Sequence, residues 1–416
     1  MAINDRPPLL SLDEALVRLL QGAADHAIAH TETVSTFDGL GRVLATEVRS
    51  AIDVPGADNS SMDGYALRVA DAAAGSLLPV AQRIPAGVVG QPLAPHTAAR
   101  IFTGAQVPAG ADAVLMQEQG EAVPGEGLGA VRVRAAPVAG EWIRRRGEDV
   151  CAGDVVLPRG ARLTPQALGL AAGVGAATLQ VVRRPRVALL STGDELVMPG
   201  EPLRPGAIYN SNRFMLRGLL QACGCDVTDL GIVPDRLQAT REALRQAALG
   251  HDLILSSGGV SVGEEDHLKP AVQAEGRLEL WQVAIKPGKP LAFGAVRASS
   301  GPNALFVGLP GNPVSSFVTF LLCVAPVLRA LQGADPSAPA GLPMRADFDW
   351  SRADKRREFL RVRLNAVGGL DLFANQSSGV LTSTVWADGL VDNPPGQVIH
   401  RGDAVRFLSL PELISR

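Results

Sequence analysis

The stretch Val187-Ala-Leu-Leu-Ser-Thr-Gly-Asp-Glu195 joins a short apolar run to a polar loop that contains glycine. The same change recurs downstream, where Leu253-Ile-Leu255 precedes a Ser/Gly-rich loop and Ala304-Leu-Phe-Val307 leads into a Gly/Pro-rich loop and an apolar helix. Between these runs, apolar residues recur at helical spacing, as in Met215, Leu216, Leu219 and Leu220. This alternation predicts an α/β domain over residues 183–333, with a mostly parallel sheet covered by helices on both faces.

Three loops of this domain consist mainly of Gly, Ser, Thr and Pro, and each follows a predicted strand. In a parallel sheet, ligands bind outside the carboxyl ends of the strands, where such loops lie. Glycine lets the backbone approach an anion, and hydroxyl groups and helix-start amides can then donate hydrogen bonds to it. Pro313 suits the first position of a helix, which would aim the amides of the last loop at the crevice. We expect an anionic ligand there, held by Ser191, Thr192, Gly193, Ser257, Gly258, Gly259, Ser261, Gly263, Pro310, Gly311, Asn312 and Pro313.

Charged side chains accompany these loops. Lys286-Pro-Gly-Lys289 places two ammonium groups on a stiff turn, where they would contact phosphate or simply be exposed. Carboxylates cluster in the same places: Asp194 and Glu195, then Asp235 after a predicted strand, then Glu264, Glu265 and Asp266 after the Gly-rich loop. Because Mg²⁺ prefers one or two carboxylates together with substrate phosphates and water, these carboxylates suggest a Mg²⁺ site. The alternative is that Asp235 and Asp266 merely cap helices.

No nucleophile motif accompanies the loops. The chain has no G-x-S-x-G, and Ser257 has no histidine that sequence alone can place beside it. There is also no G-x-x-x-x-G-K-[ST] phosphate loop. The pattern therefore favours metal-assisted transfer or hydrolysis of a phosphate derivative over acyl transfer.

Two helices are predicted outside the α/β domain. Ser11-Leu-Asp-Glu14 is a capping box at the start of an amphipathic helix. Thr164-Pro165 starts a second helix, which we expect to return and pack near the first. Residues 8–49 and 145–182 would then form one discontinuous helical and linker domain.

The remaining segments have the character of β-structure. Between residues 50 and 144, short Val/Ile/Leu runs are broken by Pro and Gly, which predicts an inserted β-rich domain. A Pro/Ala/Gly-rich linker follows Gly333. Alternating strands then predict a small C-terminal β-barrel over residues 340–416. The fold class is thus multi-domain, with α/β and β parts.

Composition excludes several classes of protein. With 39 Lys+Arg against 42 Asp+Glu, the net charge of −3 argues against a broad nucleic-acid-binding surface, which needs clustered basic residues. Aromatic residues, at 4%, are too few for stacking platforms that bind single strands. The 46% of hydrophobic residues supply enough apolar material for several cores in a chain of 416 residues. We expect small-molecule substrates and no nucleic-acid partner.

Cysteine usage and hydropathy indicate a cytoplasmic protein. Four cysteines do not make a disulfide scaffold, and Cys223-Gly-Cys225 lacks a second Cys/His pair at zinc-ligand spacing. The most apolar stretch, residues 314–331, is interrupted by polar residues and Pro326, which favours a buried helix over a membrane span. The N-terminus does not have the pattern of a secretory signal.

Seven motifs occur in the order of one known family. They are Asp58-Asn-Ser-Ser-Met-Asp-Gly-Tyr-Ala66, Arg100-Ile-Phe-Thr-Gly-Ala105, Arg145-Arg-Gly-Glu-Asp149, Ser191-Thr-Gly-Asp-Glu195, Ser256 to Gly263, Ile285-Lys-Pro-Gly-Lys-Pro290 and Gly308 to Pro313. With these motifs the chain resembles the molybdopterin molybdenumtransferases of the MoeA family, which are related to the E domain of gephyrin. The resemblance covers nearly the whole chain and is strongest from about Leu10 to Gly333.

This resemblance implies an elongated four-domain homodimer, in which the α/β domain is of the molybdopterin-binding type. It implies a reaction that takes adenylylated molybdopterin and molybdate, cleaves the pyrophosphate bond with Mg²⁺, and inserts molybdenum into the dithiolene with release of AMP. Transient contact with the adenylyltransferase and with molybdoenzymes is also implied.

Residue roles follow by motif. Asp63 and Thr103 would enter the active site from the partner subunit, and Asp149 would reach molybdate or the nucleotide. Glu195, Asp235 and Asp266 would bind Mg²⁺ or orient substrate. Phosphate contacts would come from Lys286 and Lys289, and Ser378 matches a C-terminal motif loosely. Asn210 stands where some relatives carry Asp.

Two other functions remain open at this stage. An adenylyltransferase acting on molybdopterin shares the α/β domain type, but it is expected as a short single domain with a different Gly-rich loop. A scaffold protein would keep the fold and lose the chemistry. About 180 residues precede the α/β domain, which argues against the adenylyltransferase, and intact acidic and Gly-rich motifs argue against the scaffold.

Overall fold

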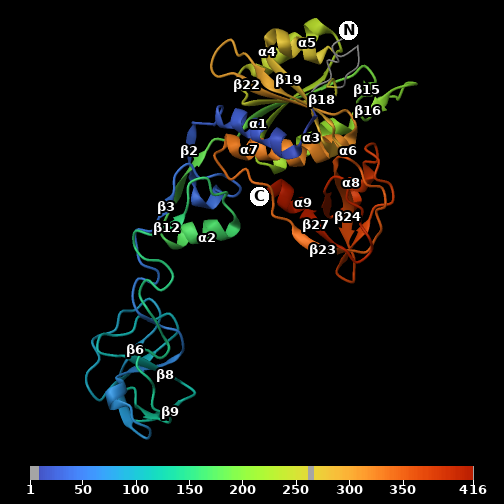
Figure 1. Ribbon diagram of the computed structural model, residues 1–416. Coiled ribbons are helices and arrows are strands. Elements are labelled where there is room, and N and C mark those ends of the chain that lie inside the picture. The colour runs from blue at the N-terminus through green and yellow to red at the C-terminus, as the bar shows by residue number, and fades with distance from the viewer. Residues whose placement is uncertain (1–8, 261–266, 416) are drawn as a thin grey trace.

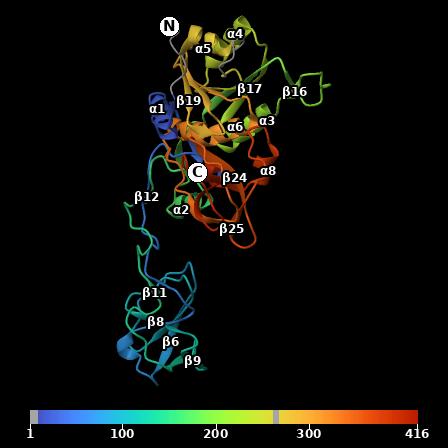
Figure 2. The same cartoon turned by 45° about the vertical axis from the view of Figure 1, so that its right-hand side comes forward.

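The computed structural model describes residues 9–260 and 267–415. The molecule is elongated: a β-rich domain lies at one end and is joined by a narrow neck to the α/β domain and the C-terminal barrel (Figure 1). A second view, turned by 45°, shows the same separation (Figure 2). The β-rich domain and the α/β domain therefore lie at opposite ends of the molecule.

A seven-stranded sheet forms the centre of the α/β domain. Its strand order is β1-β19-β21-β22-β18-β14-β17. The strands are β1 (Leu9–Leu10), β14 (Arg186–Thr192), β17 (Asp226–Val233), β18 (Leu253–Ser257), β19 (Gly276–Val283), β21 (Pro290–Val296) and β22 (Ala304–Leu309). Strand β21 runs antiparallel to both neighbours and the other pairings are parallel, which confirms the predicted mostly parallel sheet.

Helices cover both faces of this sheet because successive strand residues point to opposite sides. Val187 and Leu189 belong to the core on one face, whereas Ala188 and Leu190 belong to the core on the other. The first core includes residues of α1 (Leu12–Ala24), α3 (Ser211–Ala222), α6 (Pro313–Thr319), a π-helical turn (Phe320–Val324) and α7 (Ala325–Leu331). The second includes residues of α4 (Leu237–Ala248) and α5 (Leu268–Glu275).

The opening helix differs from the expectation in its packing. The capping box of Ser11 and Glu14 is present at the start of α1, as predicted. However, α1 packs on α7, and its buried Leu19 belongs to the α/β core. Helix α2 (Pro165–Gly173) instead packs on β12 (Val155–Leu157) and on the 3₁₀ turn Thr36–Asp38, in a separate core. The prediction that α2 returns to pack near α1 is wrong, because an amphipathic pattern shows which face is buried but not what covers it.

The stretch Pro313–Leu331 is long and apolar enough to cross a membrane by length and composition alone. Of its most apolar window, 94% is buried inside the protein. The prediction of a buried core helix is confirmed. Cys223, Cys225 and Cys323 are buried free thiols in the same core, so they fill space there rather than form disulfides.

The neck consists of two chain segments that run out to the β-rich domain and back. Three antiparallel ladders join them: β2 (Thr31–Ser35) with β13 (Thr178–Val182), β3 (Val48–Arg49) with β12, and β4 (Asn59–Ser60) with β11 (Ile143–Arg144). The β-rich domain holds a six-stranded sheet of order β8-β5-β7-β6-β10-β9. Its strands are β5 (Gly64–Leu67), β6 (Leu77–Ile84), β7 (Ala98–Ile101), β8 (Ala113–Met116), β9 (Gly120–Val123) and β10 (Ala130–Val133), with the 3₁₀ turn Val69–Asp71.

The C-terminal region is a closed barrel, as predicted. Its order is β24-β25-β23-β27-β26, and pairing of β26 with β24 closes it. The strands are β23 (Leu342–Ala346), β24 (Arg357–Leu364), β25 (Gly369–Leu372), β26 (Gly389–Asn393) and β27 (Ala404–Ser409), with the helices α8 (Thr382–Trp386) and α9 (Leu410–Ser415). Strand β20 (Ile285–Lys286) extends from the α/β domain and pairs with β24. The barrel is therefore attached to the α/β domain by backbone hydrogen bonds.

Candidate functional site

A pocket of about 570 Å³ lies where three neighbouring strands end. Strands β14, β18 and β22 are adjacent and parallel, so their carboxyl ends meet at one edge of the sheet. The pocket is lined by Thr192, Glu195, Leu196, Ile208, Tyr209, Asn210, Ser211, Asn212, Ser257, Gly258, Gly311, Asn312, Pro313 and Gly379. The three loops that the sequence singled out are thus brought together.

Hydroxyl groups lie in and beneath the floor of this pocket. Thr192 and Ser257 line it and are more than nine-tenths buried. Ser191 and Ser256 are fully buried, and within the described residues their Oγ atoms have no hydrogen-bond partner. Buried polar atoms are normally satisfied, so this edge of the sheet holds unused hydrogen-bonding capacity.

The second loop depends on two glycines in the left-handed region. Gly258 has φ +89° and Gly259 has φ +68°. A Cβ added at Gly259 would lie 2.9 Å from the Thr192 hydroxyl oxygen and 2.9 Å from Cβ of Leu268. The backbone of this loop can therefore approach the neighbouring loop only because these positions carry no side chain. Ser261, Gly263 and Asp266 lie outside the described residues.

Asn212 links the loops, and the sequence reasoning did not assign it to the site. Its Nδ2 donates to Oγ of Ser257 and to the carbonyl of Gly311, both at 2.8 Å. Asn210 caps α3 by accepting from the backbone N–H of Arg213. An Asn directly before a predicted helix is a capping signal, so Asn210 could have been placed in this way. The hydrogen bonds of Asn212 depend on the strand order of the sheet, so sequence alone could not place Asn212 in the site.

The described carboxylates near the pocket do not form a metal cluster, and Asp194 and Asp235 are not among the residues that line it. Glu195 lines the pocket, and its carboxylate folds back over Gly193, where an added Cβ would lie 2.5 Å from Oε2. The backbone nitrogen of Asp235 lies 3.5 Å from Oδ1 of Asp194. Among residues 9–260 and 267–415 no three His, Cys, Asp or Glu side chains come together to hold a metal. Asp235 is not a helix cap, since Arg236 occupies that position before α4.

The last loop enters α6 as predicted, with Pro313 at the first helical position. One of its helix-start amides does not face the pocket: the N–H of Val314 donates to the carbonyl of Ser378 at 3.0 Å. Gly379 then forms part of the pocket wall. Ser378 therefore contributes its backbone, and the barrel takes part in building the pocket together with Pro310, Gly311 and Asn312.

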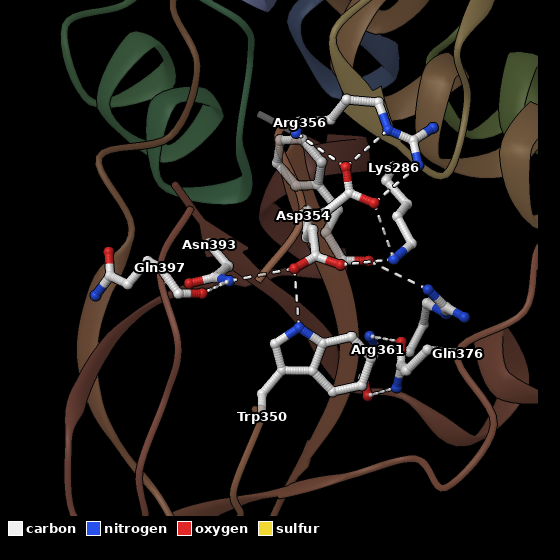
Figure 3. A network of polar contacts seen from close by, with 10 residues as sticks. Lys286, Trp350, Asp354, Arg356, Arg361, Gln376, Asn393 and Gln397 are labelled. Carbon is white, nitrogen blue, oxygen red and sulfur yellow. Dashed lines mark hydrogen bonds and ion pairs between the residues drawn. The ribbon is translucent and has the colours of Figure 1, made fainter. Parts of the chain in front are cut away.

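The two lysines of Lys286-Pro-Gly-Lys289 have different surroundings. Nζ of Lys286 lies 3.0 Å from Oε1 of Glu358 and 3.2 Å from Oδ2 of Asp354, both in the barrel (Figure 3). Burial opposes the charge on Lys286, but its hydrogen bonds to Glu358 and Asp354 outweigh this and raise the pKa of the ammonium group. Neither lysine is among the residues that line the pocket, and Lys289 is exposed.

Asp63 and Thr103 form a pair in the β-rich domain. Oδ1 of Asp63 accepts from both the backbone N–H and the hydroxyl of Thr103, each at 2.8 Å. The backbone N–H of Thr103, followed by its hydroxyl, holds the pKa of the Asp63 carboxyl below its ordinary value. Asp149 is exposed in the neck, near the ion pairs of Arg145 with Asp58 and of Arg146 with Asp53. The β-rich domain lies far from β18 and α6 of the same chain (Figure 1).

Comparison with known proteins identifies the family to which this arrangement of domains belongs. Residues 10–175 match the MoeA N-terminal region (domain I and II), residues 188–330 match a probable molybdopterin binding domain, and residues 343–410 match the MoeA C-terminal region (domain IV). The chain belongs to the MoeA family. The family expected from the seven motifs is therefore confirmed.

Relatives of this chain agree along most of its length. It is 44% identical to the molybdopterin molybdenumtransferase of Haemophilus influenzae over 326 residues, which are 78% of each chain. It is 37% identical to the molybdopterin molybdenumtransferase of a Nostoc species, over 92% of this chain and 89% of the relative. A crystal structure of the molybdopterin biosynthesis MoeA protein from Pyrococcus horikoshii matches with a TM-score of 0.79 and 29% identity, over 96% of this chain and 99% of that chain.

Proposed function

We propose that the protein inserts molybdate into the dithiolene of adenylylated molybdopterin, with cleavage of the pyrophosphate bond and release of AMP. The observation that carries this proposal is the pocket at the carboxyl ends of β14, β18 and β22, which lies in the region that matches a probable molybdopterin binding domain. Hydroxyl groups, glycine backbone and the Asn212 bridge suit a ligand with phosphate oxygens. The relatives' shared name, molybdopterin molybdenumtransferase, supports the transfer of molybdenum to molybdopterin.

Mg²⁺ fits the donor chemistry at the rim. Glu195 and Asp194 follow β14, Asp235 follows the adjacent β17, and all three carry hard oxygen ligands. Mg²⁺ takes one or two such carboxylates and completes its shell with substrate phosphate and water, so a closed protein cage is not required. When bound, Mg²⁺ would neutralise charge on the pyrophosphate. Among the described residues Glu195 is the carboxylate that lines the pocket, and we assign it the main role in holding the metal.

A site shared between two subunits accounts for Asp63 and Thr103. Both lie in the β-rich domain, at the far end of the molecule from the pocket (Figure 1). A second copy could bring its β-rich domain to the pocket, which would let the Asp63 carboxylate complete the acidic set. This arrangement supports a homodimer, and it remains a proposal, as do the cytoplasmic location and transient contact with the adenylyltransferase and with molybdoenzymes.

The direct test is AMP release from adenylylated molybdopterin, measured with and without molybdate and with Mg²⁺ present or chelated. We expect release that depends on both. Absence of release from folded protein would contradict the proposal and favour a scaffold role. Consumption of ATP with molybdopterin would instead support an adenylyltransferase, although matches to three MoeA regions along the chain favour the molybdenum transferase.

A further inference from the structure

Arg361 is a buried arginine with an unusual set of partners. Its side chain lies on β24 and the residue is 1% exposed. Within the described residues its guanidinium bonds to neutral oxygens: Nε to Oγ of Ser383 at 3.2 Å, and the terminal nitrogens to the carbonyls of Phe359 at 3.2 Å and Ser377 at 3.3 Å. Burial lowers the pKa of Arg361 to about 10, so it stays charged near neutral pH. Burying a charge among neutral partners costs free energy of folding, so the guanidinium is held in the barrel at the expense of stability.

The partners of Arg361 hold both ends of one loop, residues 375–381, here called the barrel loop. At its start, the guanidinium of Arg361 donates to the carbonyl of Ser377. The backbone N–H of Arg361 donates to Oε1 of Gln376 at 2.9 Å (Figure 3). At its end, the Ser383 hydroxyl accepts from Arg361 and donates to the carbonyl of Val380 at 2.7 Å. One side chain therefore fixes the barrel loop from two directions.

The barrel loop meets the pocket at its middle. The carbonyl of Ser378 accepts from the N–H of Val314 in α6, and Gly379 lines the pocket beside Gly311 and Asn312. The side chain of Arg361 does not line the pocket itself, so any effect of Arg361 on substrate binding must pass through the barrel loop.

We propose that Arg361 is a positioning residue for substrate binding, which holds the barrel loop against α6 so that Gly379 forms the pocket wall. This rests on the proposed function only for the identity of the substrate. The C-terminal barrel is then a part of the binding site. A guanidinium is suited to this task because its fork of donors reaches several carbonyls in fixed directions.

The test compares Arg361→Met with Arg363→Met. Arg363 lies on the same strand, but it is exposed and its guanidinium stacks on Trp386 at 4.6 Å, so its loss leaves the barrel loop untouched. For Arg361→Met we expect hydrogen exchange about tenfold faster in peptides covering 375–381 and 313–319, where the Val314 bond lies. We also expect KM for adenylylated molybdopterin to rise about tenfold with kcat within about twofold.

Arg361→Lys serves as a second variant if the Met variant does not fold. One ammonium cannot span Ser377, Phe359 and Ser383, so the same two effects are expected. Unchanged exchange in the barrel loop, or an equal rise of KM in Arg363→Met, would overturn the proposal. The exchange readout needs no turnover, so it stands even if AMP release fails in the wild-type protein.

Discussion

The ammonium nitrogen of Lys286 lies 3.0 Å from Oε1 of Glu358, and this contact joins the α/β domain to the barrel. Glu358 is 1% exposed, and its other carboxylate oxygen accepts from Nε1 of Trp350 at 2.8 Å. Backbone pairing of β20 with β24 places the two residues side by side. Lys286 therefore acts as an interdomain tie in this structure, which leaves Lys289 as the exposed cation of the motif.

Replacing Lys286 with Met should destabilise the protein. Glu358 would stay buried without its cation, at a cost of about 3 kcal/mol, the lower end of the range for a broken buried pair, because Lys286 itself is 37% exposed. Urea unfolding of Lys286→Met, Glu358→Gln and the double variant measures the coupling. Lys289→Met is the matched control and should change the free energy of unfolding by less than about 0.5 kcal/mol. Equal effects of the two lysine variants would refute the interdomain tie.

Acid should weaken the same network. Hydrogen bonds from the Arg356 side chain, then from its backbone N–H and from Lys286, hold the pKa of Asp354 far below its ordinary value, against an opposing effect of burial. The unfolded carboxyl takes up a proton below about pH 4, whereas the folded one stays ionised, so this stabilisation is present above that pH and is lost as the pH falls. Asp354→Asn should show a smaller fall in Tm between pH 5 and pH 3 than wild type. An identical fall would show that Asp354 does not contribute.

Loss of Asn212 should loosen the pocket. Asn212→Ala removes two hydrogen bonds of 2.8 Å and leaves the Gly311 carbonyl without this donor, which should cost about 1–3 kcal/mol of stability. Because Asn212 then no longer joins Ser257 at the end of β18 to Gly311 after β22, kcat/KM for AMP release should fall by at least about tenfold. Gln221→Ala, at an exposed position on α3, controls for the helix and should match wild type. Wild-type kcat/KM in Asn212→Ala would remove this residue from the site.

Subunit complementation tests the shared site. Asp63→Asn and Glu195→Gln should each nearly abolish AMP release, because each removes one carboxylate from every site. If Asp63 acts in the partner's pocket, a mixed dimer of the two variants has one intact site, and random mixing should restore about a quarter of wild-type activity. Activity that stays at the level of the separate variants would indicate that both residues act within one chain. Glu201→Gln, an exposed acidic residue near the pocket, is the control for Glu195.

Local sequence signals predicted much of this fold. The short apolar run Val187–Leu190 forms a buried strand with residues in both cores of the α/β domain, and Ser11 and Thr164 start their helices as capping residues should. The glycine-containing loops lie where strand polarity places them, around one pocket. The buried strand and the capping residues are predictable because each depends on residues within a few positions of one another, and the meeting of the loops follows from the general rule that parallel strands end at one edge of the sheet.

Other features depended on packing between distant segments. The sequence of α1 shows an apolar face, but only the folded chain places that face on α7 rather than on α2. Lys286 looks like a phosphate ligand in its motif, yet Glu358 becomes its neighbour only through the pairing of β20 with β24. Asn212 and Arg361 meet their partners across loops and strands that are far apart in sequence. Such contacts are set by topology, because hydrogen bonds and ion pairs act over a few ångströms in space, whatever the distance along the chain.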